Sequence, residues 1–346
     1  MAESDFSEDS KSRGIIWGFN VFIGIVALVL FVLGAWWGRE PNTFNVQEMA
    51  LERAKEMEIN EIPVGFVYTN TLAEIADVLL HKPGGYLTND VAPPGVFLDN
   101  VPSWEYGALV MLRDATTALR NHFARNQSQS TEDPDLSRAE PYFYYERNSW
   151  ALPSTEAEYQ KGIEALHAYM GHLSKPDANG KTAPFYPRAD NLWQYVEVVI
   201  KRLGGLSSRL TASTQRGVGN HKINTELAKA TSEAGLQQDE FDVQVASSWL
   251  EIDNIFYEAR GASWALLQIL QAIKQDFSLI LLDKRAMNTV DIMIHELQNA
   301  VAPILSPMVL NGDGFGLFAN YSLTMANSIA RANAAALDLR DVMNRG

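Results

Sequence analysis

The sequence predicts an all-α protein in which an N-terminal transmembrane helix precedes a mostly helical, bundle-like soluble domain with long ordered loops. Three observations support this prediction. One uncharged apolar run lies near the N-terminus, at 15–37. Beyond it, apolar residues recur at helical spacing, while the alternation typical of β-strands is nearly absent. Glycine and proline clusters divide the rest of the chain into pieces of helix length.

The composition fits a large folded domain and argues against several classes of function. Hydrophobic residues make up 47% of the 346 residues, which is enough for a substantial core. The formal net charge of −14 disfavours nucleic acid as a partner, because phosphate contacts need a basic surface. The chain has no cysteine, so disulfides, thiolate metal sites and a cysteine nucleophile are excluded.

The apolar run from Ile15 to Trp37 is predicted to be a retained membrane anchor. At 1.5 Å per residue it spans about 34 Å, which is enough to cross the hydrocarbon core of a bilayer. Trp17 lies at one end and Trp36 with Trp37 at the other, as interfacial aromatic residues do. A cleaved signal peptide would have a shorter apolar region of about 7–15 residues and a small-x-small cleavage site, which "VLGAWWG" does not offer.

Flanking charges predict the orientation of this anchor. Lys11 and Arg13 precede it and Arg39 follows it. The positive-inside rule therefore places residues 1–14 in the cytoplasm and residues 38–346 on the other side. In a Gram-negative cell the protein would be a single-pass inner-membrane protein with a periplasmic domain, and its first partner would be the lipid bilayer.

Helix signals recur along the soluble part. Asn70 or Thr71 is expected to begin the second soluble helix, and Pro83 with the following glycines to end it. Thr155 and Glu158 are spaced as in a capping box, which predicts another helix start. The expected helices cover about 46–59, 72–80, 103–125, 155–173, 189–210, 240–277, 287–301 and 321–343.

Two of these segments carry a stronger prediction about packing. Within 240–277, apolar residues alternate in steps of four and three from Val245 to Phe277, and further apolar residues broaden the seam. This helix is therefore expected at the centre of the domain. In 321–343, the spacing of Ala326, Ala330 and Ala334 predicts a small-residue face for close helix packing.

The polar stretch from Asn126 to Glu140 has no apolar period, so it is the best candidate for a mobile loop or an internal boundary within the 38–346 domain.

No motif points to a reaction, so no catalytic residue, metal site or cofactor is predicted. "HELQN" begins like a zinc-protease motif at His295, but Asn299 occupies the position of the second histidine. "NGDGFG", from Asn311, lacks the further oxygen ligands of an EF-hand and is interpreted as a turn. The six histidines include no pair at i,i+4, so a metal site would require distant residues to converge.

One polar set on the long helix is a candidate site. Asp253, Tyr257, Arg260 and Trp264 step by four, three and four, so they share one face. Arg260 has no acidic residue three or four positions away, and a partly buried arginine needs a partner from another element. Two interpretations remain open: a tertiary ion pair that fixes helix register, or a functional pocket. Gly261 is unfavourable within a helix, and a close backbone approach would explain it.

The segment "GGYLTNDVAPPGVFLDN" combines turn residues with apolar ones. Asn89-Asp90 and Asp99-Asn100 can close Asx turns, and the prolines between them force a bend. The apolar residues are expected to fold beneath the loop as a small core, with Phe97 or Leu98 packed on a helix. The loop is then either structural or the rim of a binding site formed by Asp90, Asp99 and Phe97.

Four long stretches carry a resemblance to a known family: "GGYLTNDVAPPGVFLDNVPSWEYGAL", "YFYYERNSWALPSTEAEYQKGIEAL", "RADNLWQYVEVVIKRLGGLSSRL" and "IDNIFYEARGASWALLQILQAIKQDF". Because of these four stretches, the chain resembles a proteobacterial family of uncharacterised membrane-anchored proteins that is known only as a domain of unknown function. The resemblance covers nearly the whole chain. It implies a Gram-negative envelope protein and carries no catalytic residues with it.

Two functions remain open at this point. The first is a non-enzymatic interaction or scaffold protein of the cell envelope, which would bind another envelope protein or a second copy of itself. The alternative is an envelope hydrolase or ligand-binding domain for glycan, peptide or lipid. It would need carboxylates converging in a cleft, and the candidates are Asp90, Asp99, Glu105, Glu251, Asp253 and Glu258.

Overall fold

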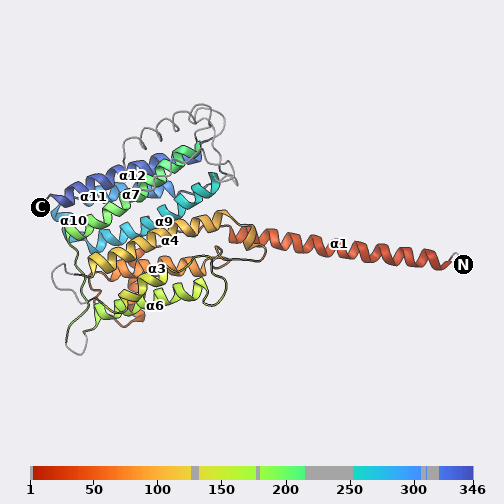
Figure 1. Cartoon of the computed structure of the whole chain (residues 1–346), viewed down its shortest axis with the longest axis horizontal. Helices are drawn as coiled ribbons and strands as arrows, with labels where there is room; N and C mark the ends of the chain where they lie inside the picture. The colour runs from red at the N-terminus through yellow and green to blue at the C-terminus, as the bar shows by residue number, and fades with distance from the viewer. Residues whose placement is uncertain are drawn as a thin grey trace, which may run out of the picture.

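The computed structural model describes residues 3–125, 132–176, 180–214, 252–304, 309 and 319–345. Every regular element in these ranges is helical, which confirms the predicted fold class. One helix, α1 (Glu3–Trp37), projects from one end of a helical bundle (Figure 1). The bundle comprises α2 (Val46–Glu56), α3 (Phe66–His81), α4 (Asn100–Ala118), α5 (Leu136–Phe143), α6 (Thr155–Ser174), α7 (Ala189–Thr214), α9 (Ile252–Asp276), α10 (Ser278–Asp283), α11 (Met287–Ala300) and α12 (Tyr321–Asn344). Two single turns, η1 (Gly95–Phe97) and the π-helical η2 (Leu119–Phe123), flank α4.

The long helices run side by side along one axis of the bundle, which is also close to the direction of α1 (Figure 1). The pair α4 and α9 forms the middle and has one of the two most extensive contacts. The helices α3 and α6 pack on one side of this pair, while α7, α11 and α12 pack on the other. The described part of the bundle thus has a layered core with α9 at its centre.

The central position of α9 agrees with the seam in its sequence. All residues from Ala259 to Leu270 are buried, so the helix is covered on every side over three turns. Residues 240–251 of the expected helix lie outside the described part of the chain, and α9 itself is described from Ile252 to Asp276.

Two glycines allow α4 and α9 to approach closely. A Cβ on Gly261 would overlap the carbonyl oxygen of Trp104 on α4. A Cβ on Gly107 would likewise overlap the carbonyl oxygen of Glu258 on α9. Helix propensity disfavours glycine at position 261, but the close contact between the backbones of α4 and α9 requires it. The sequence had suggested such a contact.

Several helix boundaries differ from the predicted ones. The helix α3 begins at Phe66 rather than near residue 72, because Asn70 and Thr71 are buried inside it instead of capping it. One amide of its first turn is satisfied from another element: the Tyr68 amide donates to Asp276 of α9 at 2.7 Å. The Phe66 amide donates to the carbonyl oxygen of Pro63 at 3.2 Å. Helix α6 is capped by Ser154, whose hydroxyl accepts from the Ala157 amide at 3.3 Å, and not by Thr155.

Two short helices and one packing face were not predicted correctly. The helix α5 occupies part of the polar stretch 126–140, of which residues 132–140 are described. The helix α10 follows α9 after a single turn residue. In α12, Ala326 is buried but Ala330 and Ala334 are exposed, so the expected alanine stripe is not the packing face.

Candidate functional site

The base of the bundle, where α1 enters, holds the candidate set on α9. Arg260 is 5% exposed, and its guanidinium makes a two-pronged ion pair with Glu40, with both N–O distances 2.6 Å. Glu40 lies 220 residues earlier in the chain, three residues after α1 ends. The same guanidinium also donates to the carbonyl oxygens of Ala300, Val301 and Ala302 at the end of α11, at 3.2, 3.3 and 3.0 Å.

Three members of the set lie around one cavity. Tyr257, Arg260 and Trp264 line a space of about 590 Å³ together with residues 38–43 and 301–304. The Trp264 indole donates to the carbonyl oxygen of Asn42 at 3.2 Å. Burial, followed by the nearby Glu40 charge, raises the pKa of Tyr257. Asp253 does not line the cavity, and its carboxylate accepts from the Asn254 amide at 3.1 Å.

The chemistry of this cavity favours a structural junction. Every donor group of Arg260 described above is engaged by Glu40 or by backbone carbonyls. An anionic ligand would therefore have to displace a bidentate carboxylate partner, which is costly for a buried arginine. The arrangement links α9, α11 and the segment after α1.

The loop after α3 is organised by Glu105 of α4, whose side chain is fully buried. Its carboxylate accepts from the amides of Leu87 and Thr88, each at 2.8 Å, and forms a buried ion pair with Lys82. Tyr86 and Leu87 are buried at the start of the loop, but Val91, Val96 and Phe97 are exposed, so the small core expected between the two Asx pairs does not form. From the sequence, Glu105 was one of several carboxylates that could line a cleft. In the structure it instead binds two loop amides and Lys82 and holds the loop on α4.

The Asx residues of this loop are used in other ways than predicted. The Asn89 amide donates to the Ser149 carbonyl at 2.9 Å and to the Glu156 carboxylate at 3.0 Å, which ties the loop to the segment before α6. Asp99 precedes α4 without a side-chain capping bond. The Asp90 carboxylate packs against Gly95, and burial, with a contribution from Glu156, raises its pKa.

The apolar tip of the loop packs on α1 rather than on the bundle. A Cβ on Gly34 would lie 3.6 Å from the Pro94 side chain and 3.9 Å from Leu98, so Leu98 is the member of the Phe97–Leu98 pair that contacts a helix. Phe97 is 75% exposed. The 3–5 kcal/mol typical of truncating a buried phenylalanine is therefore not expected for Phe97.

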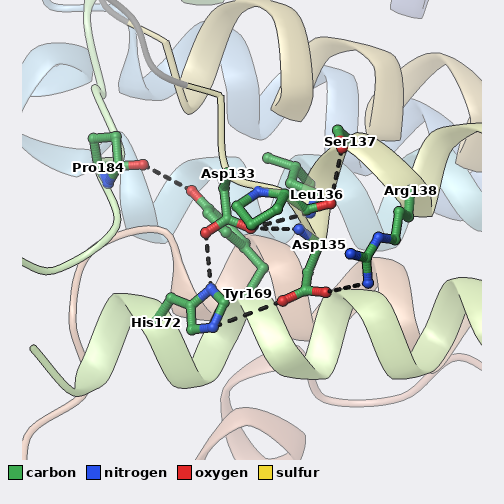
Figure 2. A network of polar contacts seen from close by, with 9 residues as sticks. Asp133, Asp135, Leu136, Ser137, Arg138, Tyr169, His172 and Pro184 are labelled. Atoms are coloured by element: carbon green, nitrogen blue, oxygen red, sulfur yellow. Dashed lines mark hydrogen bonds and ion pairs between the residues drawn. The ribbon is translucent and has the colours of Figure 1, made fainter. Parts of the chain in front are cut away.

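A second polar group lies between α5 and α6. Figure 2 shows Asp133 and Asp135 facing His172: Nδ1 of His172 is 2.8 Å from Asp133, and Nε2 is 3.7 Å from Asp135. These three side chains are close enough to share a metal ion. However, Asp133 also accepts from the amides of Asp135 and Leu136, and Arg138 pairs with Asp135, so the protein already supplies partners for the cluster.

Part of this cluster could be read from sequence. An aspartate shortly before an apolar residue is a helix start signal. Asp133 has this role, because its carboxylate accepts from the amide of Leu136, the first residue of α5. His172 lies 39 residues later and carried no signal that would place it there.

Two of the carboxylates considered for a hydrolase belong to ion pairs. Glu105 pairs with Lys82, and Glu258 pairs with Arg209 of α7, whose Nη1 lies 2.7 Å away. Glu251 lies outside the described residues.

The fold and the junction at its base define a class of protein: a layered helical bundle carried on an apolar N-terminal helix and fastened to it by a buried ion pair. The family model for DUF2333, described as an uncharacterised protein conserved in bacteria, matches residues 10–346. The chain belongs to this bacterial family. Comparison with curated proteins and with solved structures gave no match.

Proposed function

We propose that the protein is a single-pass inner-membrane protein whose helical domain lies in the periplasm and acts as an interaction or scaffold protein of the cell envelope. The membrane anchoring is supported by the apolar, uncovered surface of α1. Its segment Ile16–Trp37 has a mean hydropathy of 2.6, and the bundle buries 0% of its most apolar window. An apolar helix of this length that the bundle leaves uncovered is suited to the hydrocarbon core of a bilayer.

The scaffold role is supported by how the polar groups are used. Arg260, Glu105 and Glu258 are each buried or half-buried and each is bound to a charge of opposite sign from another element. Such pairs fix the relative positions of helices. A rigid bundle of this kind, standing on a membrane anchor, is suited to holding a partner in place.

Dual reporter fusions at Gly346 test the orientation. In a Gram-negative host, alkaline phosphatase fused there is expected to be active, while a reporter that needs the cytoplasm is expected to be inactive. The reverse pattern would contradict the periplasmic placement. If the protein leaves the membrane during carbonate washing, the anchoring itself is refuted.

In-cell chemical crosslinking tests the interaction role. Full-length tagged protein, purified from membranes after crosslinking, is expected to run as a discrete species larger than the monomer. A chain that stays monomeric at every crosslinker concentration would argue against both a partner protein and self-association.

A further inference from the structure

The end of the bundle beside α1 exposes large apolar side chains. On the loop after α3, Val91 is 65% exposed, Val96 51% and Phe97 75%. The adjoining segment before α6, held to this loop through Asn89, exposes Trp150 by 68% and Leu152 by 99%. We call residues 91–98 the tip. Its eight residues carry no charge, and Asp90 and Asp99 flank it.

The tip lies alongside the last turns of α1. In the described part of this helix, four residues between 16 and 37 are partly covered: Leu30, Leu33, Gly34 and Trp37. Their spacing of three, one and three places them on one face. Pro94 and Leu98 of the tip contact that face at Gly34. The Trp37 side chain packs against Gly84 of the same loop, where an added Cβ would lie 2.7 Å from the indole ring.

This contact fixes the depth of the tip relative to the anchor. Gly34 lies about 4–5 Å inside the end of the apolar segment, at 1.5 Å per residue. The 22 residues of that segment extend about 33 Å, slightly more than the hydrocarbon core of about 30 Å. A bilayer that surrounds α1 therefore has its interfacial region at the level of Gly34 and of the tip.

The backbone of the tip suits such a position. Pro93 and Pro94 have no amide hydrogen to leave unpaired. The amides of Val96, Phe97 and Leu98 donate to carbonyls within the tip itself, at 3.1, 3.0 and 2.9 Å. Few free donors remain, which lowers the free energy cost of leaving water. The contact would be apolar rather than ionic, since the chain is strongly acidic.

We infer that residues 91–98 form a lipid-binding loop that inserts Val91, Val96 and Phe97 into the interfacial region of the bilayer and seats the bundle on the membrane surface. The inference rests on the proposed anchoring by α1. The occupant is the acyl-chain boundary of the same bilayer that α1 crosses, because the tip is continuous with the lipid-facing surface of that helix.

The absence of cysteine makes a direct test possible in the full-length protein. Phe97→Cys carries an environment-sensitive fluorophore, and the protein is reconstituted in phosphatidylcholine vesicles with and without lipids that bear a nitroxide quencher. We expect a blue-shifted emission at position 97 that the nitroxide lipids quench and that added salt leaves unchanged. The matched control is Leu279→Cys, an 83% exposed leucine on α10 at the other end of the bundle, which should show neither effect (Figure 1).

A third position separates failure of this inference from failure of the anchor. Leu28→Cys lies within α1, where nitroxide lipids should quench any fluorophore if the helix crosses the bilayer. Quenching at 28 with none at 97 would overturn the lipid-binding loop and leave the anchor standing. If position 97 is shielded from aqueous iodide yet unaffected by nitroxide lipids, protein covers the tip, and the inference is wrong. Without quenching at 28, the anchor and the loop are both refuted.

Discussion

At the scale of single residues, Asp276 is a carboxylate in an unusual position. It lies at the end of α9 and accepts the Tyr68 amide in the first turn of α3. Burial is the main cause that raises its pKa from 3.8 to about 6, against the lowering effect of the Tyr68 and Gly65 amides. The charge therefore weakens the folded state at neutral pH, although the hydrogen bond itself joins two helices.

Replacing Asp276 with asparagine should reveal this cost. The pKa in the folded state is higher than in the unfolded state, so this group stabilises the wild type most below about pH 4, and that contribution is lost as the pH rises through about 6. Asp276→Asn retains an acceptor oxygen and removes the charge. Relative to the wild type, the variant should therefore become more stable as the pH rises from about 4 to about 6, and its unfolding free energy should increase by up to about 3 kcal/mol.

Urea unfolding at several pH values measures the difference. The exposed Asp283→Asn serves as the control, because it removes the same charge from the surface instead of from a buried site. An Asp276→Asn difference that is the same at pH 4 and pH 7 would contradict the buried-charge interpretation.

The candidate residues illustrate how far sequence could reach at this scale. Helical spacing placed Tyr257, Arg260 and Trp264 on one face, and they line one cavity. The charge of Arg260 required a partner from another element. The identity of that partner could not be predicted, because Glu40 is one of many acidic residues and meets Arg260 only after the chain has folded. At least one of Phe97 and Leu98 was expected to pack on a helix, and Leu98 does so. Which of the two it would be could not be predicted, since nothing in the sequence shows which side of a loop faces outward.

At the scale of elements, the α4–α9 contact depends on two glycines. Gly261→Ala would force a methyl group into the Trp104 carbonyl, and the helices would have to separate. The expected loss of stability is about 1–3 kcal/mol, as for other overpacked cores. The matched control is Gly205→Ala on α7, where a Cβ meets nothing within 4 Å. That change should stabilise the protein by about 0.5–1 kcal/mol through helix propensity.

Thermal unfolding of both variants gives the comparison. Opposite shifts in melting temperature are expected. Equal shifts in the same direction would show that propensity, and not the close approach of the two backbones, governs Gly261.

Helices with strong apolar periodicity could be predicted from sequence, and their boundaries less well. The helix α11 lies close to the predicted range 287–301, and the described part of α9 carries the predicted seam from Ile252 onward, because both patterns depend on local spacing. The predicted start of α3 is too late, because the Tyr68 amide in its first turn is satisfied by Asp276, about 200 residues away in the sequence. The exposed Ala330 and Ala334 show that a small-residue spacing does not by itself identify the face that tertiary packing selects.

At the scale of the whole molecule, the bundle should fold without α1, provided that Glu40 is kept. A chain that begins at Arg39 is expected to be strongly helical by circular dichroism. The same chain with Glu40→Gln leaves the guanidinium of Arg260, whose side chain is 6% exposed, without its counter-charge. Its unfolding free energy should fall by about 2 kcal/mol, less than for a fully buried pair because Glu40 is 23% exposed.

Chemical denaturation of the two shortened chains provides the measurement. Glu61→Gln, at an exposed position outside the helices, is the control and should leave stability nearly unchanged. Unaltered stability in the Glu40 variant would mean that the three carbonyl contacts suffice for Arg260. A spectrum dominated by β-structure would contradict the fold.

The Glu40–Arg260 pair also has a mechanical consequence. Only Gly38 and Arg39 separate α1 from Glu40, so the chain has no slack between α1 and the first residue that is paired to the bundle. From Arg260, the helix α9 continues for about 24 Å to Asp276, at 1.5 Å per residue. If α1 crosses a bilayer as proposed, the bundle would be held at a fixed height and orientation above the lipid. A force applied to the far end of the bundle would then tilt α1, because no flexible linker lies between the two to take up the movement.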